Sequence, residues 1–496
     1  MARSFFAPLA RRFGRQVTPV ERREFLKATL AASAGLLLSA GPAAWARRPA
    51  QGAKRVVVIG GGFAGLACAF ELKSAGYDAT LVEARGRLGG RVLSFSDMID
   101  GANVEGGAEL IGSNHPTWVA YAERFGLQWL DVTEEEGNAP IILGGKRLTD
   151  ADAEALWEEL DEATALLNDM ARSVLADEPW AGPDAKALDA RSTASWIDSV
   201  EVSDRCRAAL RILFAGDNGQ EPERQSLLGN LAQIKGGGVE AYWTESEVYR
   251  CKGGNQQLAA RLADGIGADR LIVGLSVRGV KSAGGKMEVV CSDGRSIECD
   301  DVVLATPPST WEKIEFAPPI PGAIRPQMGS NVKYLAAMKG PFWRDGGLAP
   351  DSMTDGDVTM TWHGTDEQDL SRGACLIAFS GGAASERSSA RKGKEADEAY
   401  TKALEAIYPG YSASVTKTRF MNWPQDTWTK AGYSFPAPGE VTTVGPLLAR
   451  GLGNLHFAGE HSCYKFVGYM EGALNSGATL ARRLAARDGV PGSAAR

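Results

Sequence analysis

The sequence predicts an α/β protein in which a domain built on a parallel sheet is interleaved with a second domain of α+β type. The first observation is a strand, a glycine-rich turn, a helix, a second strand and an acidic residue in succession over residues 55–83. The second is an apolar helical stripe over 151–175, with alternating strand patterns at 358–364 and 374–382. The third is the length of 496 residues at 44% hydrophobic composition, which suffices for two domains.

The first 46 residues have the pattern of a bacterial twin-arginine (Tat) signal peptide. Arg22 and Arg23 precede an apolar run over 28–40, and the small-residue site Ala44-Trp45-Ala46 follows. The run has 13 residues, fewer than the roughly 20 that span a bilayer. We therefore expect export to the periplasm and no membrane span. An uncleaved amphipathic leader stays open as the alternative.

Residues 55–83 predict a Rossmann-type dinucleotide site. A strand of β-branched residues ends at Gly60, and Gly60, Gly62 and Gly65 form the pattern GxGxxG. The three glycines allow a tight turn, close approach of backbone N–H groups to a pyrophosphate, and packing of helix on strand. The helix N-terminus then favours the anion. Glu83 ends the second strand, where an acid can accept the hydroxyl groups of a ribose.

The second domain reads as helices followed by antiparallel strands. The segment "ADAEALWEELDEATALLNDMARSVL" places Ala155, Leu156, Leu160, Ala163 and Leu167 on one stripe. The segments "VTMTWHG" and "ACLIAFSGG" alternate, which is typical of antiparallel strands.

Charge and composition argue against several classes of partner. The net charge is −7, and the first 46 residues carry +5, which leaves −12 on the remainder. An acidic body disfavours nucleic acid as a partner. The four histidines show no metal-ligand spacing, so we expect no metal site. The seven cysteines are scattered without a CxxC pair, which is no disulfide framework.

The segment "ARGRLGGRV", residues 84–92, follows the second strand directly. From here the chain resembles the flavin amine oxidase family, which includes monoamine oxidases, polyamine oxidases and L-amino acid oxidases. Further segments carry the resemblance in family order: "VEGGAELIG" (104–112), "YRCKGGNQQLAARLA" (249–263), "LSVRGVK" (275–281), "DDVVLATPPSTWEKIEFAPPIP" (300–321), "NVKYLAAMKGPFW" (331–343), "LHFAGEHS" (455–462) and "GYMEGA" (468–473).

The resemblance implies FAD as the cofactor and a discontinuous FAD-binding domain over 52–125, 246–322 and 445–487. The substrate domain would then comprise 126–245 and 323–444. The residues that the resemblance assigns to FAD are Gly60, Gly62, Ala64, Gly65, Glu83, Ala84, Arg85, Gly90, Arg91, Gly107, Ala108, Glu109, Leu110, Val277, Glu460, Tyr469 and Met470.

The resemblance also implies the catalytic residues Lys333, Tyr433 and Tyr469. The two tyrosines would face each other as an aromatic cage for the substrate, and Lys333 would hold a water near flavin N5. Gly432 stands where monoamine oxidases carry the cysteine that bonds to the flavin, so we expect FAD to be bound non-covalently. Glu471 is expected to act as a first-turn acid or cap of its helix rather than as a catalytic group.

The implied reaction is oxidation of a C–N bond, with hydrolysis of the resulting imine. L-amino acid oxidases place an arginine for the substrate carboxylate near Leu110, and here Glu109 stands beside that position. Glu109 would suit a second cationic group on the substrate, or it could be paired with an arginine. The sequence favours an L-amino acid substrate narrowly, with deamination to a 2-oxo acid, ammonia and hydrogen peroxide.

Several alternatives stay open at this point. A primary amine or polyamine is the second substrate class, and a desaturase or an interaction module that binds FAD are rival protein classes. The electron acceptor is O2 or a periplasmic acceptor, and a homodimer is an open alternative to a single chain.

Overall fold

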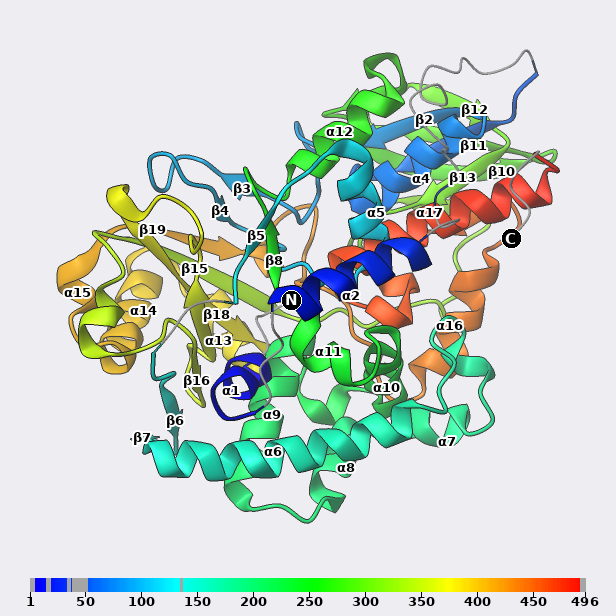
Figure 1. Cartoon of the computed structure of the whole chain (residues 1–496). Coiled ribbons are helices and arrows are strands. Elements are labelled where there is room, and N and C mark those ends of the chain that lie inside the picture. Colours follow the sequence, from blue (N-terminus) through cyan, green and yellow to red (C-terminus); the bar gives the residue numbers. More distant parts are fainter. Residues whose placement is uncertain (1–4, 15–18, 34–36, 38–51, 134–136, 491–496) are drawn as a thin grey trace.

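The computed structural model describes residues 5–14, 19–33, 37, 52–133 and 137–490 (Figure 1). Its centre is a five-stranded parallel sheet in the order β20-β13-β1-β2-β9. The strands are β1 (Arg55–Ile59), β2 (Asp78–Glu83), β9 (Leu271–Val273), β13 (Asp301–Leu304) and β20 (Leu455–Phe457). They come from three separated stretches of the chain. Val56, Val57 and Val58 of β1 are almost fully buried, as a strand covered on both faces requires.

Helices cover this sheet, and two of them touch through glycine. Helix α4 (Phe63–Ser74) leaves β1 and packs against α17 (Met470–Arg487), as Figure 1 shows. A Cβ on Gly477 would overlap the carbonyl oxygen of Ala64, so only glycine lets the two helices come this close. The flanking helices are α5 (Pro116–Phe125), α12 (Gln257–Ile266) and α16 (Glu440–Arg450).

A four-stranded sheet in the order β12-β11-β10-β14 lies beside the parallel sheet. Its strands are β10 (Val277–Ala283), β11 (Lys286–Cys291), β12 (Ser296–Cys299) and β14 (Glu315–Ala317). Two short ribbons connect this half of the molecule to the other. They are β3 (Ser94–Phe95) with β4 (Val104–Glu105), and β5 (Trp129–Asp131) with β8 (Tyr249–Cys251).

The other half contains a seven-stranded sheet in the order β19-β15-β18-β17-β16-β6-β7. The strands are β6 (Ile141–Leu143), β7 (Lys146–Arg147), β15 (Asn331–Met338), β16 (Ser352–Thr354), β17 (Met360–His363), β18 (Ala374–Gly381) and β19 (Val415–Asn422). The prediction of antiparallel strands in the 358–364 and 374–382 segments is confirmed, and the two strands, β17 and β18, are neighbours in the sheet. Helices α13 (Gly382–Ala390), α14 (Lys394–Ile407) and α15 (Tyr411–Ser414) accompany this sheet.

A helical layer completes this half of the molecule. It consists of α6 (Asp150–Ala171), α7 (Ala185–Ala190), α8 (Thr193–Ser199), α9 (Asp204–Asn218), α10 (Leu227–Gly236) and α11 (Glu240–Glu245). The predicted stripe of α6 is wrong at one position. Ala155 is exposed, whereas Ala153 and Trp157 are buried beside Leu156 and Leu160, because the buried face is centred one residue away.

Among the described residues, two helices precede the first strand, α1 (Phe6–Phe13) and α2 (Pro19–Ala32). The predicted cleavage site at 44–46 lies outside the described residues. Within the described ranges, no helix is both long and apolar enough to cross a membrane. The predicted domain boundaries stay a prediction, although the three stretches that supply the parallel sheet fall inside 52–125, 246–322 and 445–487.

Candidate active site

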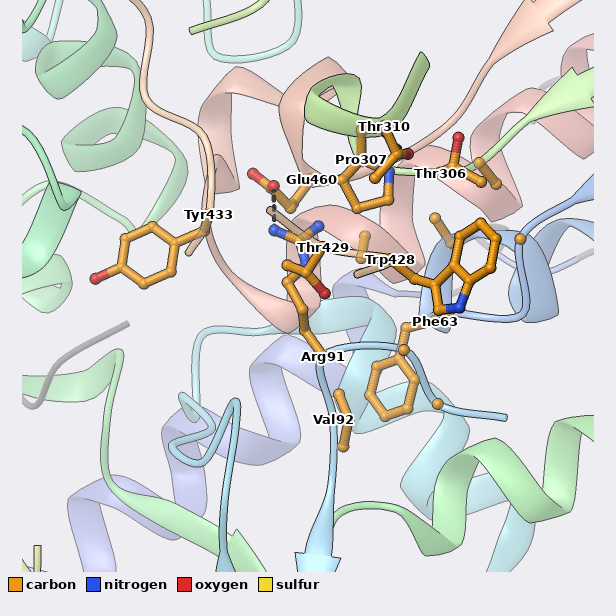
Figure 2. Close-up of a pocket in the computed structure, with 18 of the residues that line it drawn as sticks. Phe63, Arg91, Val92, Thr306, Pro307, Thr310, Trp428, Thr429, Tyr433 and Glu460 are labelled. Atoms are coloured by element: carbon orange, nitrogen blue, oxygen red, sulfur yellow. Dashed lines mark hydrogen bonds and ion pairs between the residues drawn. The ribbon is translucent and has the colours of Figure 1, made fainter. Parts of the chain in front are cut away.

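A cavity opens at the carboxyl ends of β1, β2, β13 and β20. Ligands of open α/β sheets bind in this crevice outside the carboxyl ends of the strands. Figure 2 shows residues that line it, with Tyr433 at one end and Trp428 and Phe63 at the other. Residues of both halves of the molecule contribute, so the cavity lies where the parallel sheet meets the seven-stranded sheet.

The glycine turn forms the floor of one end. Gly60 has φ +111°, which favours glycine, and Gly62 is the N-cap of α4. Glu83 is 5% exposed and lines the cavity. Its carboxylate accepts the backbone N–H groups of Gly61 at 2.6 Å and Arg85 at 2.7 Å. These two bonds fix the carboxylate and leave further acceptor positions for the hydroxyl groups of a ribose.

Arg91 and Glu460 join the motifs near the middle of the cavity. Arg91 donates to the carbonyl of Gly432 at 2.9 Å and to Glu460 at 2.8 Å, the dashed contact in Figure 2. Glu460 also accepts the hydroxyl of Ser434 at 2.6 Å and the N–H of Gly468 at 2.9 Å. Burial alone would raise the pKa of Glu460, but Arg91 and its other donors lower it. Glu460 is therefore a carboxylate that holds three segments together.

Tyr433 and Tyr469 both line the end of the cavity next to β15. The Tyr433 hydroxyl donates to the carbonyl of Gly216 at 3.0 Å. The Tyr469 ring packs edge-on against His115 with ring centroids 5.2 Å apart. Burial raises the pKa of Tyr469 well above its ordinary value, so its hydroxyl stays neutral. Both predicted cage residues thus present aromatic surface to one cavity.

Glu471 lies in the first turn of its own helix α17, as expected, but its carboxylate caps the N-terminus of another helix, α5. Its side chain is fully buried, and its two carboxylate oxygens accept the N–H groups of Thr117 and Trp118, each at 2.9 Å. These donors belong to the first turn of α5, which has no N-cap side chain because His115 makes no capping bond. Burial raises the pKa of Glu471 to about 7.

Lys333 lines the cavity, but its ammonium group is fully engaged. It donates to the Glu109 carboxylate at 2.6 Å and to the carbonyls of Glu105 at 2.9 Å and Gly107 at 3.1 Å. An ammonium has three N–H donors, so none remains for the predicted water in this arrangement. Glu109 also pairs with Arg250 at 3.3 Å. Of the two roles that the sequence left open for Glu109, the structure therefore shows pairing with an arginine.

Three predicted cofactor residues, Gly65, Glu109 and Leu110, do not line the cavity. Glu109 is 1% exposed and Leu110 7% exposed, whereas their neighbours Gly107 and Ala108 do line it. The physical reason is the charge pairing of Glu109, which turns its carboxylate toward Lys333. Gly65 also stays behind the cavity wall, where a Cβ would overlap the Gly60 carbonyl. The other predicted cofactor residues that line the cavity are Ala64, Ala84, Arg85, Gly90, Val277 and Met470.

Sequence reasoning missed the aromatic residues that close the cavity. Trp423 and Trp428 line it, and the Trp423 ring N–H donates to the Gly106 carbonyl at 3.0 Å. Both stand in "MNWPQDTW", just before the segment that contains Tyr433. The closeness of these tryptophans to Tyr433 in the sequence could have indicated that they line the same cavity. Among the described residues no cluster could hold a metal, and the seven cysteines are buried free thiols.

This geometry fits a flavin dinucleotide. The cavity runs from an acid that can accept ribose hydroxyls, past a helix N-terminus and Arg91 suited to a pyrophosphate, to an aromatic end. A Cβ on Gly60 would meet the backbone of Ala305, and one on Gly90 would meet the Cα of Gly62, so glycine lets these backbone segments of the cavity wall pack closely. These features define the class of FAD-dependent oxidoreductases.

Comparison with known proteins gives the family. Residues 63–485 match the family described as flavin containing amine oxidoreductase, and the chain belongs to it. FAD is its cofactor, and it is an oxidoreductase of amines. Putrescine oxidase of Kocuria rosea is 27% identical over 82% of this chain and 87% of its own. An L-amino acid dehydrogenase of Synechocystis sp. is 26% identical over 86% of this chain and 94% of its own.

Solved structures agree with this fold. Cyclohexylamine oxidase from Brevibacterium oxydans has a TM-score of 0.79 and is 26% identical, covering 88% of this chain and 100% of that one. The predicted α/β fold with a Rossmann-type FAD-binding unit and an α+β companion is therefore confirmed.

Proposed function

We propose that this protein is an FAD-dependent oxidase of a primary amine. FAD supplies the redox chemistry. The chain orients the amine between Tyr433 and Tyr469, and water then hydrolyses the imine to a carbonyl compound and ammonia. O2 is the proposed electron acceptor, with hydrogen peroxide as the second product. A buried aromatic end favours the neutral amine, because desolvation disfavours an ammonium ion.

The engaged state of Lys333 supports an amine over an amino acid. The basic residues that line the cavity are Arg85, Arg91, Lys313 and Lys333. Of these four, Lys333 lies on β15, opposite Phe379 of β18, at the end of the cavity that contains the two tyrosines. The carboxylate of Glu109 already neutralises the charge of Lys333. A carboxylate of the substrate would have to compete with that buried pair.

An L-amino acid, the substrate that the sequence favoured, is the second candidate. Similarity to the Synechocystis protein named L-amino acid dehydrogenase supports it, at 26% identity. A dehydrogenase would pass electrons to an acceptor other than O2, and a periplasmic acceptor would serve an exported enzyme.

A panel of substrate pairs that differ only in the carboxylate separates the candidates. Phenethylamine is compared with L-phenylalanine, putrescine with L-ornithine, and cadaverine with L-lysine. We expect the amine of each pair to reduce the flavin faster under anaerobic conditions and to release peroxide in air. Faster reduction by the amino acids would establish the second candidate, and reduction by neither class would refute both.

We also propose export to the periplasm, on the strength of the twin-arginine pattern alone. Replacing Arg22 and Arg23 together by lysine should leave the FAD-loaded protein in the cytoplasm. An unchanged amount of that variant in the periplasm would refute a Tat leader.

A further inference from the structure

Lys333 belongs to a buried chain of four charges. Its ammonium pairs with Glu109, Glu109 pairs with Arg250, and Arg250 pairs with Asp366. All four residues are at most 5% exposed. The charges alternate in sign along this chain, which ends at Lys333 in the wall of the cavity.

We propose that Glu109 is a positioning residue for Lys333. Its carboxylate holds the ammonium against the carbonyls of Glu105 and Gly107, and Gly107 itself lines the cavity. Glu109 thereby shapes the segment beside the flavin and cancels the lysine charge there. Glu109 does not line the cavity, so it acts through Lys333 and not on a substrate.

The pairing has an electrostatic consequence with a definite sign. Reduced flavin carries negative charge, which a nearby positive charge stabilises. Removing the charge of Glu109 makes the cluster more positive and should raise the flavin midpoint potential. Removing the charge of Lys333 makes the cluster more negative and should lower this potential. A purely structural role would not produce shifts of opposite sign.

The test measures the flavin potential and the affinity for sulfite, which binds more tightly when negative charge on the flavin is stabilised. Glu109→Gln should raise the potential and tighten sulfite binding on the order of tenfold, and Lys333→Met should do the reverse by a similar factor. Neither measurement requires turnover, so the outcome does not depend on which amine is the substrate. Shifts of the same sign, or a parent-like Glu109→Gln, would overturn the proposal.

A double variant and a matched control complete the design. Glu109→Gln with Lys333→Met leaves the net charge of the cluster unchanged, so the double variant should retain FAD and return the potential toward that of the parent. If the double variant shifts the potential or loses FAD as much as the single variants do, the proposed pairing of Glu109 with Lys333 is wrong. Asp189→Asn removes a buried carboxylate that bonds Ser226 and Thr442 outside the cavity, and it should leave the potential unchanged.

A different observation carries a second inference, which concerns helices α1 and α2. Phe5 and Leu9 are among the most deeply buried large side chains, and the Phe6 ring lies 4.8 Å from Trp157 and 5.4 Å from Trp243. Ala7 lines a second, smaller cavity together with Tyr469. Helix α1 therefore forms part of the wall on the substrate side of the cage.

Helix α2 buries the first arginine of the twin pair. Arg22 is 5% exposed and bonds Glu245 at 3.3 Å, Asp131 at 3.1 Å and the Thr133 hydroxyl at 2.8 Å. An export receptor cannot bind the guanidinium of Arg22 while helix α2 is docked on the protein. We infer that the docked α1–α2 segment is an autoinhibitory contact, which covers the smaller cavity and hides Arg22 at the same time.

The test uses the full-length, FAD-loaded chain. Phe6→Asp with Leu9→Asp should release α1 and speed the association of benzylamine, followed by the change in the flavin spectrum, on the order of tenfold. Lys27→Ala, at an exposed position of α2, is the control and should match the parent. An association rate in the double variant equal to that of the parent would overturn the inference. Normal FAD content in every variant shows that the fold is intact.

Discussion

From the buried carboxylate of Glu471 we predict how much the free energy of unfolding falls when this residue is replaced. It supplies both acceptors for the first turn of α5 although it belongs to α17. Glu471→Ala removes both acceptors and leaves two buried N–H donors unsatisfied. Each such donor costs about 1–3 kcal/mol, so the loss is about 2–6 kcal/mol. Glu471→Gln keeps one acceptor and should cost roughly half as much.

The pH dependence follows from the raised pKa of Glu471, about 7 in the folded chain. In the unfolded chain the group ionises near its ordinary value of about 4.3. The folded state therefore holds its proton over a range in which the unfolded state has lost it. The contribution is fully present at low pH and is lost as pH rises through about 7, with a total change of about 3 kcal/mol. The glutamine variant cannot show this change.

The assay is urea unfolding of the FAD-loaded protein, followed by flavin fluorescence at pH 4.5 and pH 8 with the same excess of FAD. The free energy of unfolding of the parent should fall between these pH values by about 3 kcal/mol more than that of Glu471→Gln. Glu105 and Glu440 also have pKa values raised to about 7 by burial, and their contributions cancel in this difference. A parent and variant with parallel pH profiles would refute the reasoning.

Three further predictions concern the cofactor and the cage. The protein should release FAD on acid precipitation, since Gly432 offers no side chain for a covalent bond, and flavin that stays with the polypeptide would contradict this. Glu83→Ala should weaken FAD binding by about 1.5–3 kcal/mol in equilibrium dialysis, and an unchanged affinity would show that Glu83 is not the ribose acceptor. Tyr433→Ala and Tyr469→Ala should each slow anaerobic flavin reduction on the order of 100-fold, with Tyr469→Phe affected much less and FAD content normal in all three. Reduction at the parental rate in Tyr469→Ala would make Tyr469 a core residue.

Local pattern was sufficient for the nucleotide-binding unit. The strand predicted over 55–59 is β1, and the second strand ends at Glu83 as predicted. A run of β-branched residues, three spaced glycines and an acid each act through their neighbours in sequence, so their positions can be predicted without the rest of the chain. The order of the family segments likewise predicted that Tyr433, Tyr469 and Lys333 would meet at one cavity.

The partners of the buried charges were decided by the tertiary structure. Lys333 meets Glu109 across 224 positions of sequence, and Glu471 meets Thr117 across 354. At the sequence level Glu109 suited a substrate cation as well as an arginine, and Glu471 suited the cap of its own helix. A buried carboxylate must be paired where the fold places it, because leaving a charge or a helix N–H unpaired away from water costs several kcal/mol. Which donor is close enough to pair depends on how distant segments pack, and no local pattern in the sequence contains that distance.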